Sequence, residues 1–157
     1  MTTPALIDDL KRDEGFRARA YQDDQGNWTI GYGHTPADPR EVWTEDEAAT
    51  QLAVDVDITC EHLDRELPWW RRLDLVRQDA LANMGFNLGV GLAPCAEHPD
   101  GSGLQEFQHM LAALEAGDFA RASAQALISR WAKDPPEGVG ARAERIAAMF
   151  RTGKRHP

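Results

Sequence analysis

The chain has 157 residues and a mass of 17.5 kDa, enough for one well-buried core and too short for two full-sized independent domains. Hydrophobic residues make up 42% and charged residues 27%, a balance that excludes a disordered, collagen-like or repeat protein. Acidic residues outnumber basic ones by 26 to 17, and the net charge of -9 argues against nucleic acid as a partner, because phosphate binding needs a positive surface.

The chain shows no export, membrane or metal-binding pattern. No apolar run approaches the length of a membrane span, and Asp8 and Asp9 interrupt the first ten residues, so no secretory signal is predicted. Cys60 and Cys95 lack zinc-site spacing and are expected to be reduced thiols. The five histidines also lack ligand spacing, so neither a metal nor any other cofactor is expected.

The first part of the chain predicts a helix followed by a β-hairpin. An apolar stripe runs to Leu10, and Glu14 follows four residues later on the same face, so this helix ends by carrying a carboxylate inward. Residues 18–22 form a predicted strand, and residues 28–32 alternate as the returning strand. The turn between them, residues 23–27, contains a glycine that can supply a positive φ.

The rest of the chain predicts helices. Thr44 opens a Ser/Thr-x-x-Glu capping box, which marks the start of a long helix that ends at Pro68. Residues 89–103 form a Gly- and Pro-rich loop, either a lid or a tolerated insertion, and residues 135–138 break the chain again. Further apolar stripes predict helices over residues 76–88, 104–114, 119–131 and 139–150. The predicted fold class is α+β and mainly helical, with one early hairpin.

The residues that suggest chemistry lie in and around the predicted hairpin. Three of these side chains can converge on one point: Glu14 at a helix end, Asp23 at the mouth of the hairpin and Thr29 on the returning strand. Such a set suits glycosidic hydrolysis, in which one carboxyl protonates the leaving oxygen and the other assists a water or stabilises positive charge. Partial desolvation favours a protonated Glu14, whereas Asp23 in a polar turn should stay ionised. A helix-end Glu and a turn Asp are also common structural residues, so spacing alone leaves that alternative open.

This segment resembles the active-site signature of phage-type lysozymes, the T-even phage lysozyme family of endolysins. The match consists of Asp-Glu-Gly at 13–15, Asp23, and Thr-Ile-Gly-Tyr-Gly-His at 29–34. Further similar segments follow in order at residues 44–57, 83–89, 129–131 and 150–153. The resemblance therefore covers nearly the whole chain.

The resemblance implies a single lysozyme-like domain over residues 1–157, with a two-lobed fold. A small hairpin lobe over about residues 14–43 would carry the active site, and residues 1–13 and 44–157 would form the helical lobe, with a cleft between the two lobes.

The family match also implies roles for individual residues. Glu14 would be the general acid, Asp23 the second carboxylate and Thr29 a positioner of the attacking water. The implied reaction is hydrolysis of the β-1,4 bond between N-acetylmuramic acid and N-acetylglucosamine in peptidoglycan, with inversion at the anomeric carbon.

Further contacts are suggested by the same resemblance. Phe86 and Asn87 match a cleft-lining, substrate-binding pair; a core Phe and a helix-end polar residue are the alternative. Thr35 would touch a sugar or else lie in a surface loop. His34 and the helical Asp55 match a pair that can face each other, so an ion pair is expected, against the alternative of two separately solvated side chains.

An endolysin without an export signal would accumulate in the host cytoplasm and reach the wall when a separate pore protein, a holin, releases it for host cell lysis. Peptidoglycan is the expected partner, and we expect a monomer without stable membrane association. A lytic transglycosylase, which uses a single acid, and a non-catalytic peptidoglycan-binding module remain as alternatives. The presence of Asp23 and Thr29 together with Glu14 favours the hydrolase.

Overall fold

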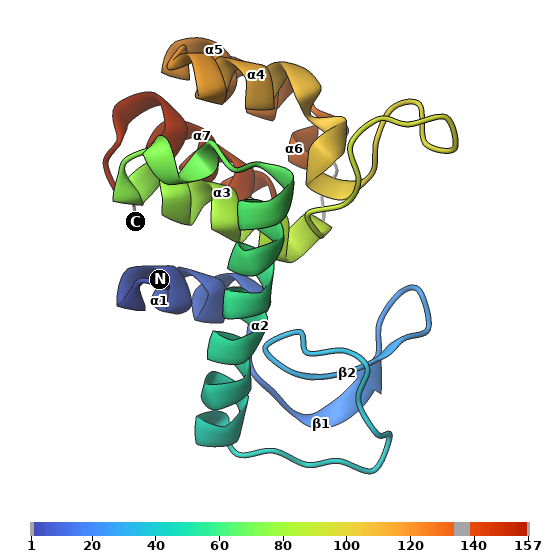
Figure 1. The fold of residues 1–157 in the computed structure, drawn as a ribbon. Helices are drawn as coiled ribbons and strands as arrows, with labels where there is room; N and C mark the ends of the chain where they lie inside the picture. Colours follow the sequence, from blue (N-terminus) through green and yellow to red (C-terminus); the bar gives the residue numbers. More distant parts are fainter. Residues whose placement is uncertain (1, 134–138, 157) are drawn as a thin grey trace. The chain divides into compact units, whose positions relative to one another are not determined.

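A computed structural model describes residues 2–133 and 139–156 of the chain. It is mainly helical with one two-stranded antiparallel sheet, which confirms the predicted α+β fold class (Figure 1). The chain divides into two compact units, residues 1–58 and 59–157, and each is described by itself.

The first unit opens with helix α1, Pro4–Glu14. Thr3 caps the helix, because its Oγ1 accepts the Leu6 N–H at 3.0 Å, and a proline at the first helical position fits the start of a helix. Gly15, with a φ of 69°, ends the helix, so Glu14 is its last residue, as predicted.

Strands β1, Arg17–Gln22, and β2, Trp28–Gly31, form the predicted hairpin, with Tyr21 opposite Thr29. The returning strand ends one residue earlier than predicted. The reason is a tight turn at Gly31 and Gly33, whose φ values are 66° and 86°, after which Ile30 and His34 exchange two backbone hydrogen bonds of 3.0 and 2.9 Å.

Helix α2, Glu45–Glu66, begins at the predicted capping box. The Glu47 N–H donates to Thr44 Oγ1 at 3.2 Å, and the Thr44 N–H donates to Glu47 Oε2 at 2.8 Å. A short 3-10 helix, η1 at Trp70–Arg72, follows Pro68. Trp70 is buried there, and its indole N–H donates to Asp64 at 2.7 Å, so this residue is part of a hydrophobic bend.

The second unit consists of packed helices. Their bounds are α3 Leu75–Leu88, η2 Gly103–Glu106, α4 Gln108–Ala116, α5 Phe119–Ile128, α6 Arg130–Lys133 and α7 Val139–Thr152. Helix α5 packs against both α4 and α7, and α7 also packs against α3 (Figure 1). Met84, Leu114, Ala122 and Phe150 are fully buried in this unit, so each of these four helices contributes to the core.

Two predicted helices are shorter than the apolar stripes suggested. The stripe over 104–114 is split because Phe107, with φ −85° and ψ 48°, leaves the helical conformation between η2 and α4. The helix predicted over 119–131 ends at Ile128, because Ser129 is extended and its hydroxyl donates to the Ala126 carbonyl at 2.6 Å. The predicted break at residues 135–138 lies outside the described residues.

The loop over residues 89–103 folds back on itself. Leu92 and Ser102 are joined by two hydrogen bonds, Leu92 N–H to Ser102 Oγ at 2.9 Å and Ser102 N–H to the Leu92 carbonyl at 3.0 Å. Cys95 is exposed in this loop and Cys60 is buried in α2, and both are free thiols.

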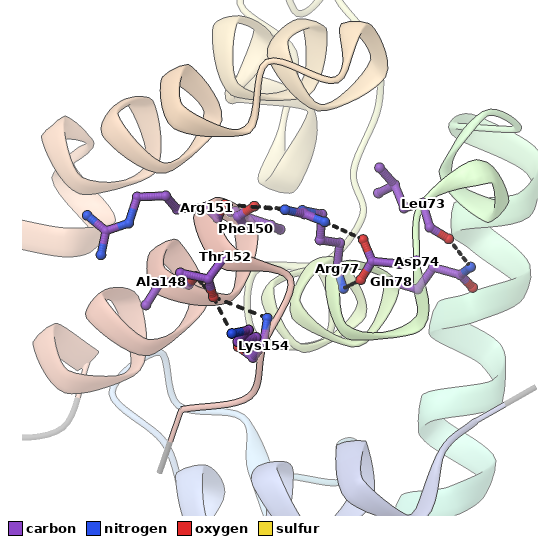
Figure 2. Close-up of polar contacts among 9 residues, drawn as sticks. All are labelled: Leu73, Asp74, Arg77, Gln78, Ala148, Phe150, Arg151, Thr152 and Lys154. Carbon is purple, nitrogen blue, oxygen red and sulfur yellow. Dashed lines mark hydrogen bonds and ion pairs between the residues drawn. The ribbon is translucent and has the colours of Figure 1, made fainter.

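Arg77 joins three helices of the second unit, and Figure 2 shows its contacts with two of them, α3 and α7. Its Nε donates to the Phe150 carbonyl at 2.7 Å and its Nη2 to the Arg151 carbonyl at 3.3 Å, which satisfies carbonyls in the last turn of α7. The same guanidinium pairs with Asp74, the N-cap of α3, and lies 3.5 Å from the ring centroid of Phe119 in α5. One side chain therefore connects α3, α5 and α7.

Candidate active site

Glu14 is placed by the end of α1. Its side chain is half-buried and lies close to Gly33, in the turn that follows β2. A Cβ added at Gly33 would lie 3.5 Å from Glu14 Oε2. That is an ordinary van der Waals distance, so a side chain here would cover this face of the carboxyl group without a clash. The φ of Gly33, 86°, is the feature that favours glycine.

Asp23 is held by its own turn. Its Oδ1 accepts the N–H groups of Gln25 at 2.9 Å and Asn27 at 2.8 Å, and its Oδ2 accepts the Asn27 side-chain amide at 3.2 Å. These hydrogen bonds, that from the Asn27 backbone first, lower the pKa of Asp23 against the opposing effect of desolvation. Asp23 is therefore a carboxylate at neutral pH.

Thr29 lies on β2 and is buried. Its hydroxyl donates to the carbonyl of Asn27 at 3.3 Å, and the same carbonyl accepts the Asp23 N–H at 2.9 Å. The Asn27 carbonyl thus connects Asp23 and Thr29, and the Asn27 side chain adds a contact to Asp23. Asn27 was not predicted, although an Asn at the end of an Asp-initiated turn is a recognisable sequence signal.

Two further side chains of the first unit lie at the exit of the hairpin. Thr35 is exposed, and its hydroxyl donates to the Trp28 carbonyl at 3.1 Å, which ties the exit loop to β2. The predicted contact between His34 and Asp55 is confirmed, with Nδ1 2.9 Å from Oδ2. Asp55 also accepts the Gln51 amide at 2.9 Å, so the hairpin is fastened to α2.

A second link between the hairpin and α2 was not predicted. Tyr32 is buried, and its hydroxyl donates to Glu45 Oε1 at 2.9 Å. Burial, together with the hydrogen bond to that carboxylate, raises the pKa of Tyr32. An aromatic residue at the end of a strand gives no sequence signal for this partner, because Glu45 lies 13 residues further along the chain.

The second unit contains a hollow of about 720 Å³. Asn87 lines it, and the Trp131 indole N–H donates to Asn87 Oδ1 at 2.9 Å. Phe107 meets Trp131 edge-on, with ring centroids 6.4 Å apart, so an aromatic pair forms one wall. Phe86 is half-buried and is not among the residues that line this hollow.

The predicted site residues are therefore distributed over both units. Glu14, Asp23, Thr29 and Thr35 belong to the unit of residues 1–58, and Phe86 and Asn87 belong to that of residues 59–157. Within residues 2–133 and 139–156, no three His, Cys, Asp or Glu side chains gather so that they could hold a metal ion. No helix in this described part is long and apolar enough to cross a membrane.

Comparison with known proteins agrees with this architecture. The family model described as phage lysozyme matches residues 11–147. The pre-baseplate central spike protein Gp5 of Enterobacteria phage T4 is 27% identical over 95% of the chain, which spans only 28% of that protein's length. An endolysin of Acyrthosiphon pisum secondary endosymbiont phage 1 is 29% identical over 82% of the chain and 78% of its own length. A probable T4-type lysozyme of Dictyostelium discoideum is 26% identical over 95% of both chains.

The helical α+β fold with its small hairpin is lysozyme-like. Because the family match covers most of its length, the chain belongs to the phage lysozyme family.

Proposed function

We propose that the chain is a muramidase that hydrolyses the β-1,4 bond between N-acetylmuramic acid and N-acetylglucosamine in peptidoglycan. The observation that carries the proposal is the pair of unlike carboxyl groups on the first unit. Glu14 is half-buried against Gly33, whereas Asp23 accepts three hydrogen bonds that keep it ionised. Two carboxyl groups in different environments suit acid and base roles in glycoside hydrolysis.

In the proposed mechanism Glu14 donates a proton to the glycosidic oxygen as the bond to the anomeric carbon breaks. Asp23 stabilises the developing positive charge and accepts a proton from the attacking water. The Thr29 hydroxyl proton is committed to the Asn27 carbonyl, so its oxygen can accept a hydrogen bond from that water. Attack from the face opposite the leaving group inverts the anomeric carbon.

Asn87 and Trp131 in the hollow of the second unit are proposed to contact the substrate, as is Thr35 in the first unit. An aromatic wall beside amide groups suits a ligand with both apolar and polar faces, such as a wall glycopeptide. Phe86 does not line this hollow, and its contact with substrate stays a prediction. We also propose that the protein acts as a monomer in host lysis and reaches the wall from the host cytoplasm by holin-dependent release.

The test is clearing of permeabilised bacterial cells by the purified full chain and by its Glu14→Gln variant. The amide removes the proton donor at nearly constant shape, so the rate should fall by at least about 100-fold while the thermal unfolding midpoint is retained. Asp23→Asn should also lower the rate, and the matched control Asp24→Asn should not, because Asp24 is the exposed neighbouring carboxylate in the same turn. Clearing by Glu14→Gln at the wild-type rate would contradict the mechanism.

Mass spectrometry and NMR of the released muropeptides separate the alternatives. A hydrolase gives a hydrated reducing end, initially with the inverted anomeric configuration. Anhydromuramic products would indicate a lytic transglycosylase instead. Binding to the wall without released fragments would indicate a non-catalytic module.

A further inference from the structure

Asn27 contacts two of the candidate catalytic groups, Asp23 and Thr29. Its backbone N–H donates to Asp23 Oδ1 at 2.8 Å and its side-chain amide to Asp23 Oδ2 at 3.2 Å. Its carbonyl accepts the Asp23 N–H at 2.9 Å and the Thr29 hydroxyl at 3.3 Å. A single residue thus contacts both oxygens of one group and the hydroxyl of the other.

The acceptor capacity of Asp23 shows what the amide does. Each carboxylate oxygen has two lone-pair directions, and Oδ1 already accepts two backbone N–H groups, from Gln25 and Asn27. The side-chain amide of Asn27 takes one direction of Oδ2. Among the contacts of the described residues, Oδ2 therefore has one acceptor direction left. The amide of Asn27 restrains the rotation of the carboxylate group and so sets where that direction points.

The turn itself does not depend on this amide. The Gly26 N–H donates to the Asp23 carbonyl at 2.9 Å, and the Gln22 side chain donates to the Gly26 carbonyl at 3.2 Å. Together with the backbone bonds between Asp23 and Asn27, these contacts close the turn without the Asn27 side chain. Loss of the amide should therefore change the orientation of Asp23 and leave the hairpin folded.

We propose that Asn27 is a positioning residue for glycoside hydrolysis: its amide orients the free acceptor direction of Asp23 Oδ2, and its carbonyl orients the Thr29 hydroxyl, so that both oxygens face the attacking water. This inference rests on the proposed function of the same site. It adds a residue whose side chain acts through Asp23 and not on the substrate. Among the described residues, the donors to Asp23 come from its own turn, namely Asn27 and Gln25 at its carboxylate and Gly26 at its backbone carbonyl.

The experiment compares Asn27→Ala with Gln25→Ala in the full chain, measuring kcat and KM on soluble glycan strands from about pH 3 to about pH 9. Asn27→Ala should lower kcat roughly tenfold with little change in KM, because a hydrogen bond to a charged group is lost without a substrate contact. The acid-side midpoint of its kcat profile should move to higher pH, since the lost hydrogen bond favoured the ionised form of Asp23. Gln25→Ala should match the wild type, because only its backbone N–H contacts Asp23.

Asn27→Asp serves as a second variant of nearly the same shape. Its carboxylate would face Asp23 Oδ2, so kcat should fall further at neutral pH and the acid-side midpoint should rise further. A wild-type kcat profile in Asn27→Ala, or a change in KM alone, would overturn the positioning role while leaving the muramidase proposal intact. Failure of the wild-type protein to release fragments would overturn the muramidase proposal itself. In that case, NMR titration of the Asp23 carboxyl carbon in wild type and in Asn27→Ala still shows whether loss of the amide changes the pKa of Asp23.

Discussion

Three glycines of the hairpin allow backbone strain and side-chain contact to be separated. Gly26, Gly31 and Gly33 all have positive φ values, of 82°, 66° and 86°. Alanine in that conformation destabilises the folded state by about 1–2 kcal/mol. Alanine also restricts the unfolded chain more than glycine does, which offsets roughly 0.4–1 kcal/mol of that loss. At Gly26 nothing lies within 4 Å of an added Cβ, so Gly26→Ala should lower the free energy of unfolding by about 1 kcal/mol.

Gly31→Ala adds a steric contact to the same backbone strain. Its Cβ would lie 3.0 Å from the Cβ of Ala48 and 3.0 Å from a ring carbon of Trp43, and both neighbours are held in the packed first unit. Overpacking of this kind costs about 1–3 kcal/mol, so the total loss should be roughly 2–4 kcal/mol. Urea unfolding of the full chain, followed by tryptophan fluorescence, measures the difference between the two variants. Equal losses for Gly31→Ala and Gly26→Ala would refute the steric part of the reasoning.

Gly33→Ala links this series to the site. Its Cβ would stand 3.5 Å from Glu14 Oε2, an ordinary contact distance, so its stability loss should resemble that of Gly26→Ala. The added methyl group nevertheless covers one face of the carboxyl group, and the clearing rate should fall by about tenfold if that face meets the substrate. A stable Gly33→Ala protein with wild-type clearing would mean that this face is not used.

Two other contacts give separate stability predictions. Asp55→Asn and His34→Ala should show a coupling free energy of about 1 kcal/mol in a double-mutant cycle, because their side chains form a part-buried contact of 2.9 Å; additive losses would exclude a coupled pair. Asp64→Asn should lower the free energy of unfolding by about 1 kcal/mol at pH 7, after allowance for the exposure of the carboxylate. The hydrogen bond from the Arg71 guanidinium is the main cause that lowers the pKa of Asp64. The stability that this bond contributes is therefore present above the pKa of Asp64 in the unfolded chain, and it is lost as pH falls through the lower pKa of the folded protein. The unfolding free energies of wild type and Asp64→Asn should converge in acid, and a difference that stays constant with pH would contradict this origin.

The sequence predicted those parts of the fold that depend on local chemistry. The capping box at Thr44 located the start of α2, and the alternation around Ile30 located the hairpin, because both signals lie within a few residues. The breaks at Phe107 and Ser129 were missed, since the apolar period continues across them while the backbone conformation changes.

The candidate site was predictable to a different extent. Sequence patterns placed Glu14 at a helix end, Asp23 in a turn and Thr29 on a strand. The roles of these residues came from the family resemblance. The hydrogen bonds of Asn27 could not be predicted, because side-chain direction in a turn depends on the conformation of every residue in it. The hollow around Asn87 arises from helices that are distant in sequence and has no local signal.

The contacts of Arg77 have a consequence for how the second unit is made. Its partner carbonyl at Phe150 lies 73 residues further along the chain. Closing a loop of that length costs about 4 kcal/mol of chain entropy, which the contacts formed afterwards must offset. While the protein is being synthesised, α3 and α5 leave the ribosome before α7, the helix against which both pack. Until α7 emerges, the faces of α3 and α5 that pack against it lack this cover, and we expect the nascent chain to need chaperones that bind exposed apolar surface.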